Sequence, residues 1–239
     1  MVRPASVAAI FGALALVPSG FAAAGPYEDA KAANDAQDYV RALSLWRPLA
    51  EHGNSDAEVQ VGLLYLAGHG VAQDDAEAVR WLRMAALKGQ AEAQLYLGEC
   101  YLNGRGVTAD QAAASQWFAK SADQGNAAAE YKMGVLTRAG GDLPSVWRTA
   151  AEWFRKAADQ GHVGAQVTLA VMFAQGQGVT QDNVEALKWL DIAVVRLPAS
   201  ETARREALDK VRAALAAKMT PAQVSDAALF AQKWTPGGN

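Results

Sequence analysis

The sequence predicts an all-α fold, a right-handed α-solenoid of antiparallel helix pairs, and two observations support it. Marker residues recur in steps of 36 positions between about residues 38 and 195, and repetition at such a period is typical of solenoids. Each unit also holds two stretches with apolar residues at helical spacing, separated by glycines. Hydrophobic residues make up 51% of the chain and charged residues 20%, which is enough apolar surface for a packed core.

Glycine and aromatic residues mark the repeat most clearly. Glycine ends helices because it adopts the left-handed conformation without steric cost, and small residues let helix axes approach closely. We interpret the tryptophans as core between repeats rather than as a stacking ladder for bases or sugars. The expected structural positions are Gly62, Tyr65, Gly68, Gly70, Trp81, Gly89, Gly98, Tyr101, Gly104, Gly106, Trp117, Gly125, Gly134, Trp153, Gly161, Phe173, Gly176, Gly178 and Trp189.

One unit shows how both helices are predicted. Apolar residues at spacings of four, seven and eight positions predict a first helix over Ser55 to Ala67. A Gly-His-Gly-Val turn follows, and Asp74 caps a second helix that runs to Lys88. A Glu three positions after the cap predicts a capping box, and Asp182 with Glu185 repeats this arrangement.

The chain divides into four predicted parts. Residues 1–24 read as a signal peptide, with a basic start, a short apolar run and cleavage after Ala24; an uncleaved membrane anchor is the alternative. A divergent helix pair is expected over 25–54, where Pro48 should kink the second helix, and the solenoid over 55–197. Capping helices follow over 198–239, one from about Ser200 to Lys218 and one from Thr220. Three side chains of the last helix should cover the end of the solenoid: Leu229, Phe230 and Trp234.

Charge and cysteine content exclude several classes of function. The net charge is -3 and no basic patch is evident, which argues against nucleic-acid binding. The single cysteine, Cys100, cannot form an internal disulfide. It occupies a repeat position that is apolar in the other repeats, so we expect a buried thiol. His52, His69 and His162 occupy turn columns and are interpreted as solvated surface residues. We therefore predict no enzyme activity, no metal and no cofactor.

One set of positions is a candidate binding surface. On the first helix of each repeat, positions at i, i+3 and i+7 vary freely, and first helices line the concave face of such solenoids. The alternative is that these residues merely face solvent. The candidate partner-binding residues are Gln60, Leu63, Tyr96, Glu99, Asn103, Lys132, Val135, Thr168, Val171 and Gln175. Two alanines, Ala67 and Ala139, occupy the same repeat positions.

The recurring residues of each unit form the pattern Ala-x4-Gly-x2-Tyr-x2-Gly-x-Gly-Val, followed by Asp, Ala-x2-Trp and Ala-Ala-x2-Gly. This pattern resembles the Sel-one-like repeat, a relative of the tetratricopeptide repeat. The third repeat departs from it, because its loop begins Gly140-Gly141-Asp142 and Thr137 replaces the aromatic residue. Its helix pair should persist with an altered turn. Cysteine-rich relatives linked to β-lactam binding carry a disulfide in each repeat, which this chain lacks.

The resemblance implies an exported adaptor that binds a protein or peptide partner and regulates an envelope signalling or assembly system. The predicted location is the periplasm or the exterior, without stable membrane insertion once the signal peptide is removed. A cell-envelope enzyme or ligand-binding protein acting on peptidoglycan or β-lactams is the alternative, and an assembly factor without a persistent partner is a third. The sequence leaves the partner and the oligomeric state open.

Overall fold

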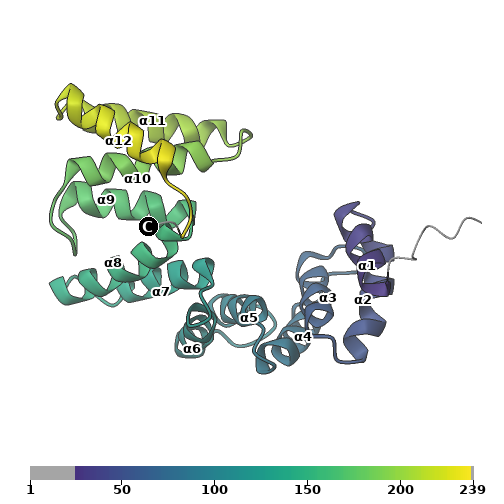
Figure 1. Cartoon of the computed structure of the whole chain (residues 1–239). Helices are drawn as coiled ribbons and strands as arrows, with labels where there is room; N and C mark the ends of the chain where they lie inside the picture. Colours follow the sequence, from purple (N-terminus) through teal and green to yellow (C-terminus); the bar gives the residue numbers. More distant parts are fainter. Residues whose placement is uncertain (1–24, 238–239) are drawn as a thin grey trace, which may run out of the picture.

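The computed structural model describes residues 25–237, and the predicted signal peptide lies outside this range. The described part is all-helical and follows an open arc, with α1 at one end and α12 at the other (Figure 1). The helices are α1 (Pro26–Asp35), α2 (Tyr39–Glu51), α3 (Ser55–Ala67), α4 (Asp75–Leu87), α5 (Ala91–Asn103), α6 (Gln111–Ala122), α7 (Ala127–Ala139), α8 (Pro144–Asp159), α9 (Val163–Gln175), α10 (Asn183–Arg196), α11 (Thr202–Ala216) and α12 (Pro221–Lys233).

Helices pack in consecutive pairs, and each pair packs on the next, as an α-solenoid requires. The first predicted helix has the bounds of α3. The third repeat keeps its pair, α7 and α8, with an altered turn, as expected. Its C-cap residue Gly140 is right-handed, whereas Gly68, Gly104 and Gly176 end α3, α5 and α9 in the left-handed conformation.

The predicted N-caps are present, but the predicted capping boxes are wrong. The Asp74 carboxylate accepts a hydrogen bond from the Glu77 amide at 2.9 Å. The Glu77 side chain turns away to Arg80 and to the indole N–H of Trp81. Glu185 likewise pairs with Lys188, because these nearby cations compete with a backbone amide for the carboxylate. The reciprocal pair is formed instead at the start of α12, by Thr220 and Gln223.

Only two of the four tryptophans that recur at the 36-residue period are buried in the core, which corrects the prediction. Trp81 and Trp189 are buried, whereas Trp117 and Trp153 are half-buried and carry Lys120 and Lys156 over their rings at 4.3 Å. The adjacent column is fully buried and packs against the small residues of the first helices. Its members are Leu82, Phe118, Phe154 and Leu190.

A polar column is also buried inside the solenoid, at the 36-residue period. Its side chains lie on the first helices, and three of them bond to the residue 30 positions later, at distances of 2.6 to 2.8 Å. The pairs are Glu58 with Lys88, Gln94 with Gln124, and Glu130 with Gln160. The fourth member, Gln166, donates to the carbonyl of Ala158. The first three pairs tether the two helices of one repeat at one end, and Gln166 ties α9 to α8 of the preceding repeat.

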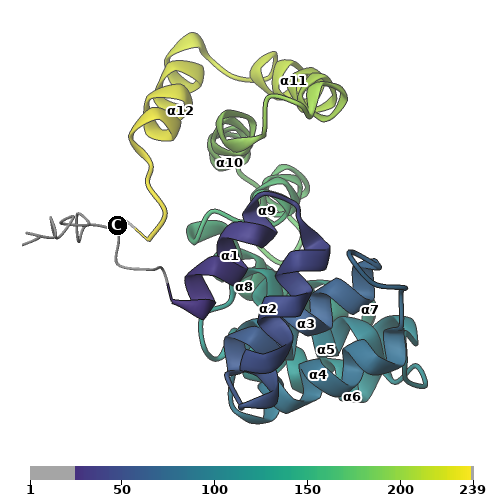
Figure 2. The ribbon, with the colours of Figure 1, turned by 90° about the vertical axis from the view of Figure 1, so that its right-hand side faces the viewer.

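The end of the solenoid is covered differently from the prediction. Leu229 and Phe230 are exposed, at 48% and 43%, because α12 packs on α10 through its small face, Ala227 and Ala231. Trp234 does reach the core and meets the Trp189 ring edge-on. The chain after α12 returns to the body of the solenoid, where the amide of residue 237 donates to the carbonyl of residue 159; Figure 2 shows α11 and α12 beyond α10.

Candidate functional site

A groove of about 460 Å³ crosses the first helices of the two regular repeats at the N-terminal end. Five of the predicted partner-binding residues line it. They are Gln60 and Leu63 from α3, and Tyr96, Glu99 and Asn103 from α5. Ala67 lines it as well. The first half of the predicted surface therefore forms one cavity.

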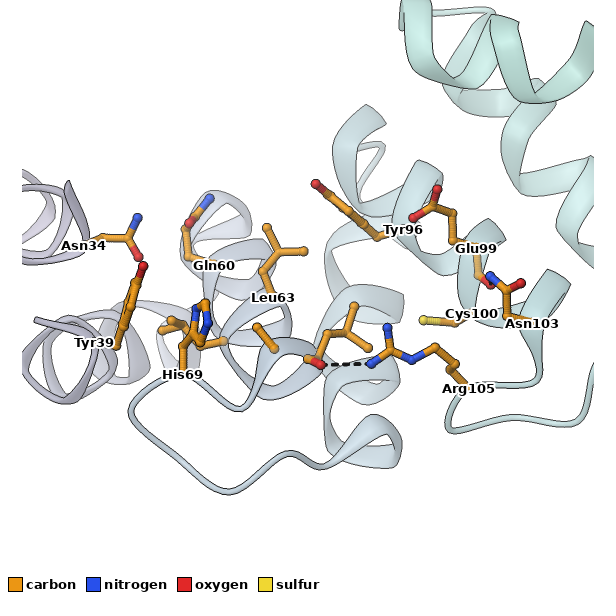
Figure 3. A pocket seen from close by; sticks show the side chains of 13 residues that line it. Asn34, Tyr39, Gln60, Leu63, His69, Tyr96, Glu99, Cys100, Asn103 and Arg105 are labelled. Atoms are coloured by element: carbon orange, nitrogen blue, oxygen red, sulfur yellow. Dashed lines mark hydrogen bonds between the residues drawn. The ribbon is translucent and has the colours of Figure 1, made fainter. Parts of the chain in front are cut away.

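Helical geometry explains this convergence. Residues three and seven positions apart share one face of a helix, and the 36-residue repeat places the same face of α5 beside that of α3. Figure 3 shows the Tyr96 and Glu99 side chains facing the groove from α5, across from Leu63 and Gln60 on α3. The groove thus offers an aromatic ring, an aliphatic side chain and amides within one opening.

Two carboxylates lie near the Tyr96 side chain, and one of them is neutralised by an ion pair. Burial, with the nearby carboxylates of Glu92 and Glu99, raises the pKa of the Tyr96 hydroxyl. Burial and the proximity of Asp56 also raise the pKa of Glu92. Glu99 is paired with Lys132 at 2.6 Å. The other charged lining residue, Arg105, forms an ion pair with Asp75, so the charges that line the groove are compensated.

Seven lining residues were absent from the sequence-based set: the apolar Leu64, Leu66 and Cys100, and four side chains that are polar or aromatic. Asn34 and Tyr39 come from the N-terminal pair, while His69 and Arg105 are the variable residues of two Gly-x-Gly turns. The His69 ring stacks on Tyr39 at 4.3 Å. Arg105 donates to the Leu66 carbonyl at 2.8 Å, the dashed line in Figure 3. The variation of His69 and Arg105 between repeats was the available signal, but polar turn residues are usually solvated.

The remaining predicted residues do not continue the groove, so the predicted surface is not one stripe. Val135 packs against the C-terminal core, and the Thr168 hydroxyl donates to the Gly164 carbonyl of its own helix. Val171 and Gln175 line a second hollow, between α9 and α11. Lys132 reaches the groove only through its ion pair with Glu99.

The predictions for two titratable residues, Cys100 and His162, can be compared with the structure. Cys100 is buried, as expected, and burial raises the pKa of its thiol to about 11. His162 is not a solvated turn residue. Its ring stacks on Tyr131 at 4.5 Å, and its Nδ1 accepts a hydrogen bond from the Ala165 amide, capping α9. Burial, followed by the Lys132 charge, lowers the pKa of this imidazole.

Within residues 25–237, no group of three His, Cys, Asp or Glu side chains is arranged to hold a metal ion. None of the helices in that range combines the length and hydropathy of a bilayer-crossing segment.

Two solved structures resemble this chain in both sequence and fold. A Sel1 repeat protein from Oxalobacter formigenes is 33% identical over 72% of this chain and 49% of its own, with a TM-score of 0.63. A protective antigen with an SLR fold from uropathogenic Escherichia coli is 27% identical over 88% of this chain and 52% of its own, with a TM-score of 0.54. This chain therefore spans about half the length of either protein.

A third structure supports the fold alone. It is a putative Sel1 repeat protein from Klebsiella pneumoniae, 18% identical over 80% of this chain and 91% of its own, with a TM-score of 0.50. The comparison with curated proteins gives no match.

The family model described as the Sel1 repeat matches five consecutive stretches, 35–54, 55–90, 91–126, 127–162 and 163–194. The four later stretches coincide with the helix pairs α3–α4 to α9–α10. Sel1 repeat proteins generally act as scaffolds for protein–protein interactions. Because these matches cover more than half of the sequence, the chain belongs to the Sel1 repeat family.

Proposed function

We propose that this chain is a scaffold that binds a segment of a partner protein in the groove between α3 and α5. One observation carries the proposal: side chains that vary between repeats, from two consecutive first helices, line a single cavity. Scaffold positions recur while these do not, which is the pattern of a recognition surface placed on a fixed fold.

The chemistry of the groove suits an extended peptide. Tyr96 and Leu63 offer apolar surface for a side chain, and the amides of Gln60, Asn34 and Asn103 can pair with peptide backbone.

Photo-crosslinking can test this function. A photoreactive residue at Leu63 should crosslink to a protein partner, and Tyr96→Ala should reduce the yield at least about tenfold, the effect of losing roughly 1.4 kcal/mol of binding energy. Val195→Ala is the matched control, because Val195 is an apolar residue that is 70% exposed and outside the groove. Equal yields from the Tyr96→Ala and Val195→Ala variants would contradict the proposal.

We also propose that the protein acts outside the cytoplasm, in the periplasm or as a secreted protein, where it regulates an envelope signalling or assembly system. Support comes from the basic start, apolar run and Ala22-Ala23-Ala24 of the N-terminal segment. Cell fractionation and N-terminal sequencing test it. A mature protein that begins at Gly25 is expected, and an intact N-terminus on cytoplasmic protein would refute it.

A further inference from the structure

The second glycine of each Gly-x-Gly-Val turn has a defined place in the solenoid. It lies on the first turn of the second helix in the preceding pair, so close that an added Cβ would lie 2.0 to 2.4 Å from backbone atoms there. Gly70 lies on Tyr39, Gly106 on Asp75 and Gly178 on Trp147. A side chain at this position would therefore prevent the contact.

The rest of the turn completes this contact. In the first turn the His69 ring stacks on Tyr39, and in the second turn Arg105 forms an ion pair with Asp75 at 2.7 Å. The valine that follows is half-buried against the core; Val107, for example, lines a hollow with Ala76 and Val79 of α4. The turns at Gly70 and Gly106 thus cover the start of a helix with a backbone contact, a polar side chain and an apolar side chain, and the turn at Gly178 makes the backbone contact one turn into α8.

The third repeat does not make this contact on α6. By the 36-residue period, Asp142 falls where the second glycine belongs, Gly141 falls at the variable position, and Leu143 falls at the valine. The Cβ of Asp142 excludes the close approach, and Leu143 is 66% exposed. The α8 helix begins at Pro144, one turn earlier than the period predicts, which draws this segment away from α6.

A hollow of about 470 Å³ lies where the turn would have packed. Its walls come from α6 and α7: Gln111, Ala112, Ser115, Met133, Leu136 and Thr137. Gln111 and Ala112 are the counterparts of Asp75 and Ala76, the residues on which Gly106 rests. The hollow is therefore the site of a turn that three other repeats supply from within the chain.

We propose that this hollow binds a loop of a partner protein that has the chemistry of the missing turn. The loop would place a glycine on the Gln111–Ala112 backbone, a polar side chain at the Gln111 amide, and a β-branched apolar side chain against Ala112 and Ser115. The occupant is identified by the three intramolecular copies, which show what fits this surface. The hollow shares no lining residue with the groove, so the inference does not depend on the proposed function.

A peptide from the chain itself is a suitable probe. A peptide with the sequence of residues 102–110, which contains the second regular turn, is titrated into the full chain while amide NMR shifts are recorded. Shifts at Gln111, Ala112 and Ser115 are expected. The matched control peptide carries Gly106→Asp, the residue found at 142, and should bind at least about tenfold more weakly because its Cβ excludes the contact.

Two variants of the protein complete the test. In the first, residues 140–146 carry the sequence of residues 104–110, so that the chain closes its own hollow and no longer binds the peptide. In the second, Ala112→Trp fills the hollow without altering the loop and should also abolish binding. The proposal is overturned if the unmodified chain does not bind the peptide, if the Gly106→Asp peptide binds equally well, if both variants still bind, or if the shifts fall on the groove around Tyr96.

Discussion

At the scale of single residues, the buried polar column contains two carboxylates in different settings. Glu58 is fully buried and forms an ion pair with Lys88 at 2.6 Å. Glu130 is 5% exposed and accepts a hydrogen bond from the neutral Gln160. Burial raises the pKa of Glu130, and the Lys156 charge and the Gln160 hydrogen bond offset part of that rise. The charge of Glu130 is therefore the less well compensated of the two.

Glu130→Gln should stabilise the protein at pH 7, by on the order of 1 kcal/mol. The folded carboxyl keeps its proton to higher pH than the unfolded one, which ionises near pH 4.3. Stability therefore falls as the pH rises through the window between the two pKa values, and Gln removes this loss. Urea unfolding at pH 7 and pH 4 measures it, with a smaller gain expected at pH 4. Glu58→Gln is the control and should destabilise, since it breaks an ion pair; a loss of stability in both variants would refute the argument.

His162→Asn should make stability less dependent on pH. Nδ1 of His162 can accept from the Ala165 amide only while the ring is neutral. The pKa of the folded imidazole is lowered below about 6.5, so stability falls as the pH drops from that value toward the folded pKa. The variant keeps the cap, because asparagine caps α3 and α7 at the same repeat position.

Thermal unfolding at pH 7.5 and pH 5.5 measures this effect. The difference between wild type and His162→Asn should grow at the lower pH by up to roughly 1 kcal/mol, the usual worth of an N-cap. His52→Asn is the control, because the exposed His52 ring contacts the Pro48 carbonyl at the C-terminal end of α2 and accepts no amide at a helix N-terminus. An unchanged difference at the two pH values would contradict the prediction.

At the scale of helices, the two helices of each pair pack with a small residue of the first helix facing a large residue of the second. A Cβ on Gly98 would lie 2.7 Å from the Phe118 ring, and one on Gly134 would lie 2.7 Å from Phe154. In the last repeat Ala170 replaces the glycine, and the large residue of that pair is Leu190. The last repeat thus accommodates an alanine opposite a leucine, whereas in the first repeat Gly62 faces Leu82 and an added Cβ would lie 2.8 Å from it.

Gly98→Ala should destabilise the chain by roughly 1–3 kcal/mol through overpacking. The double variant Gly98→Ala/Phe118→Leu should recover at least half of this loss, because it reproduces the pair found in the last repeat. Denaturant unfolding of both single variants and the double variant gives the coupling energy. Additive losses would show that the two positions are not fitted to each other.

The same helices show what could be predicted from sequence. Glycine and tryptophan columns recur in phase, so the helix pairs and the family resemblance followed from periodicity. The polar column recurs with the same period at Glu58, Gln94 and Glu130, yet polar residues are usually exposed, so its burial was missed. Five of the ten predicted partner-binding residues lie outside the groove, because side-chain spacing fixes the face of a helix but not which neighbouring element lies beside it, as at Val171.

At the scale of the whole molecule, the core is uneven along the solenoid. The cluster that joins α5, α6 and α7 contains five buried residues, whereas the C-terminal cluster contains nineteen. At this same junction the turn of the third repeat leaves the start of α6 without the contact made by Gly70, Gly106 and Gly178. Because a solenoid is stabilised mainly by contacts between neighbouring repeats, we expect the second and third repeats to separate more readily than the third and fourth.

Hydrogen exchange of the full chain should therefore show α6 and α7 opening before α9 and α10. Amides of α6 and α7 should exchange on the order of tenfold faster than those of α9 and α10. This factor corresponds to an opening free energy that is lower by about 1.4 kcal/mol. The variant that carries the sequence of residues 104–110 at positions 140–146 should slow exchange in α6, because it restores the glycine contact and buries a valine. A matched swap within the regular repeats, residues 68–74 replaced by the sequence of residues 104–110, should leave α6 unchanged. If α6 and α7 are protected as strongly as α9 and α10, then packing across this junction is stronger than its small core and missing turn imply.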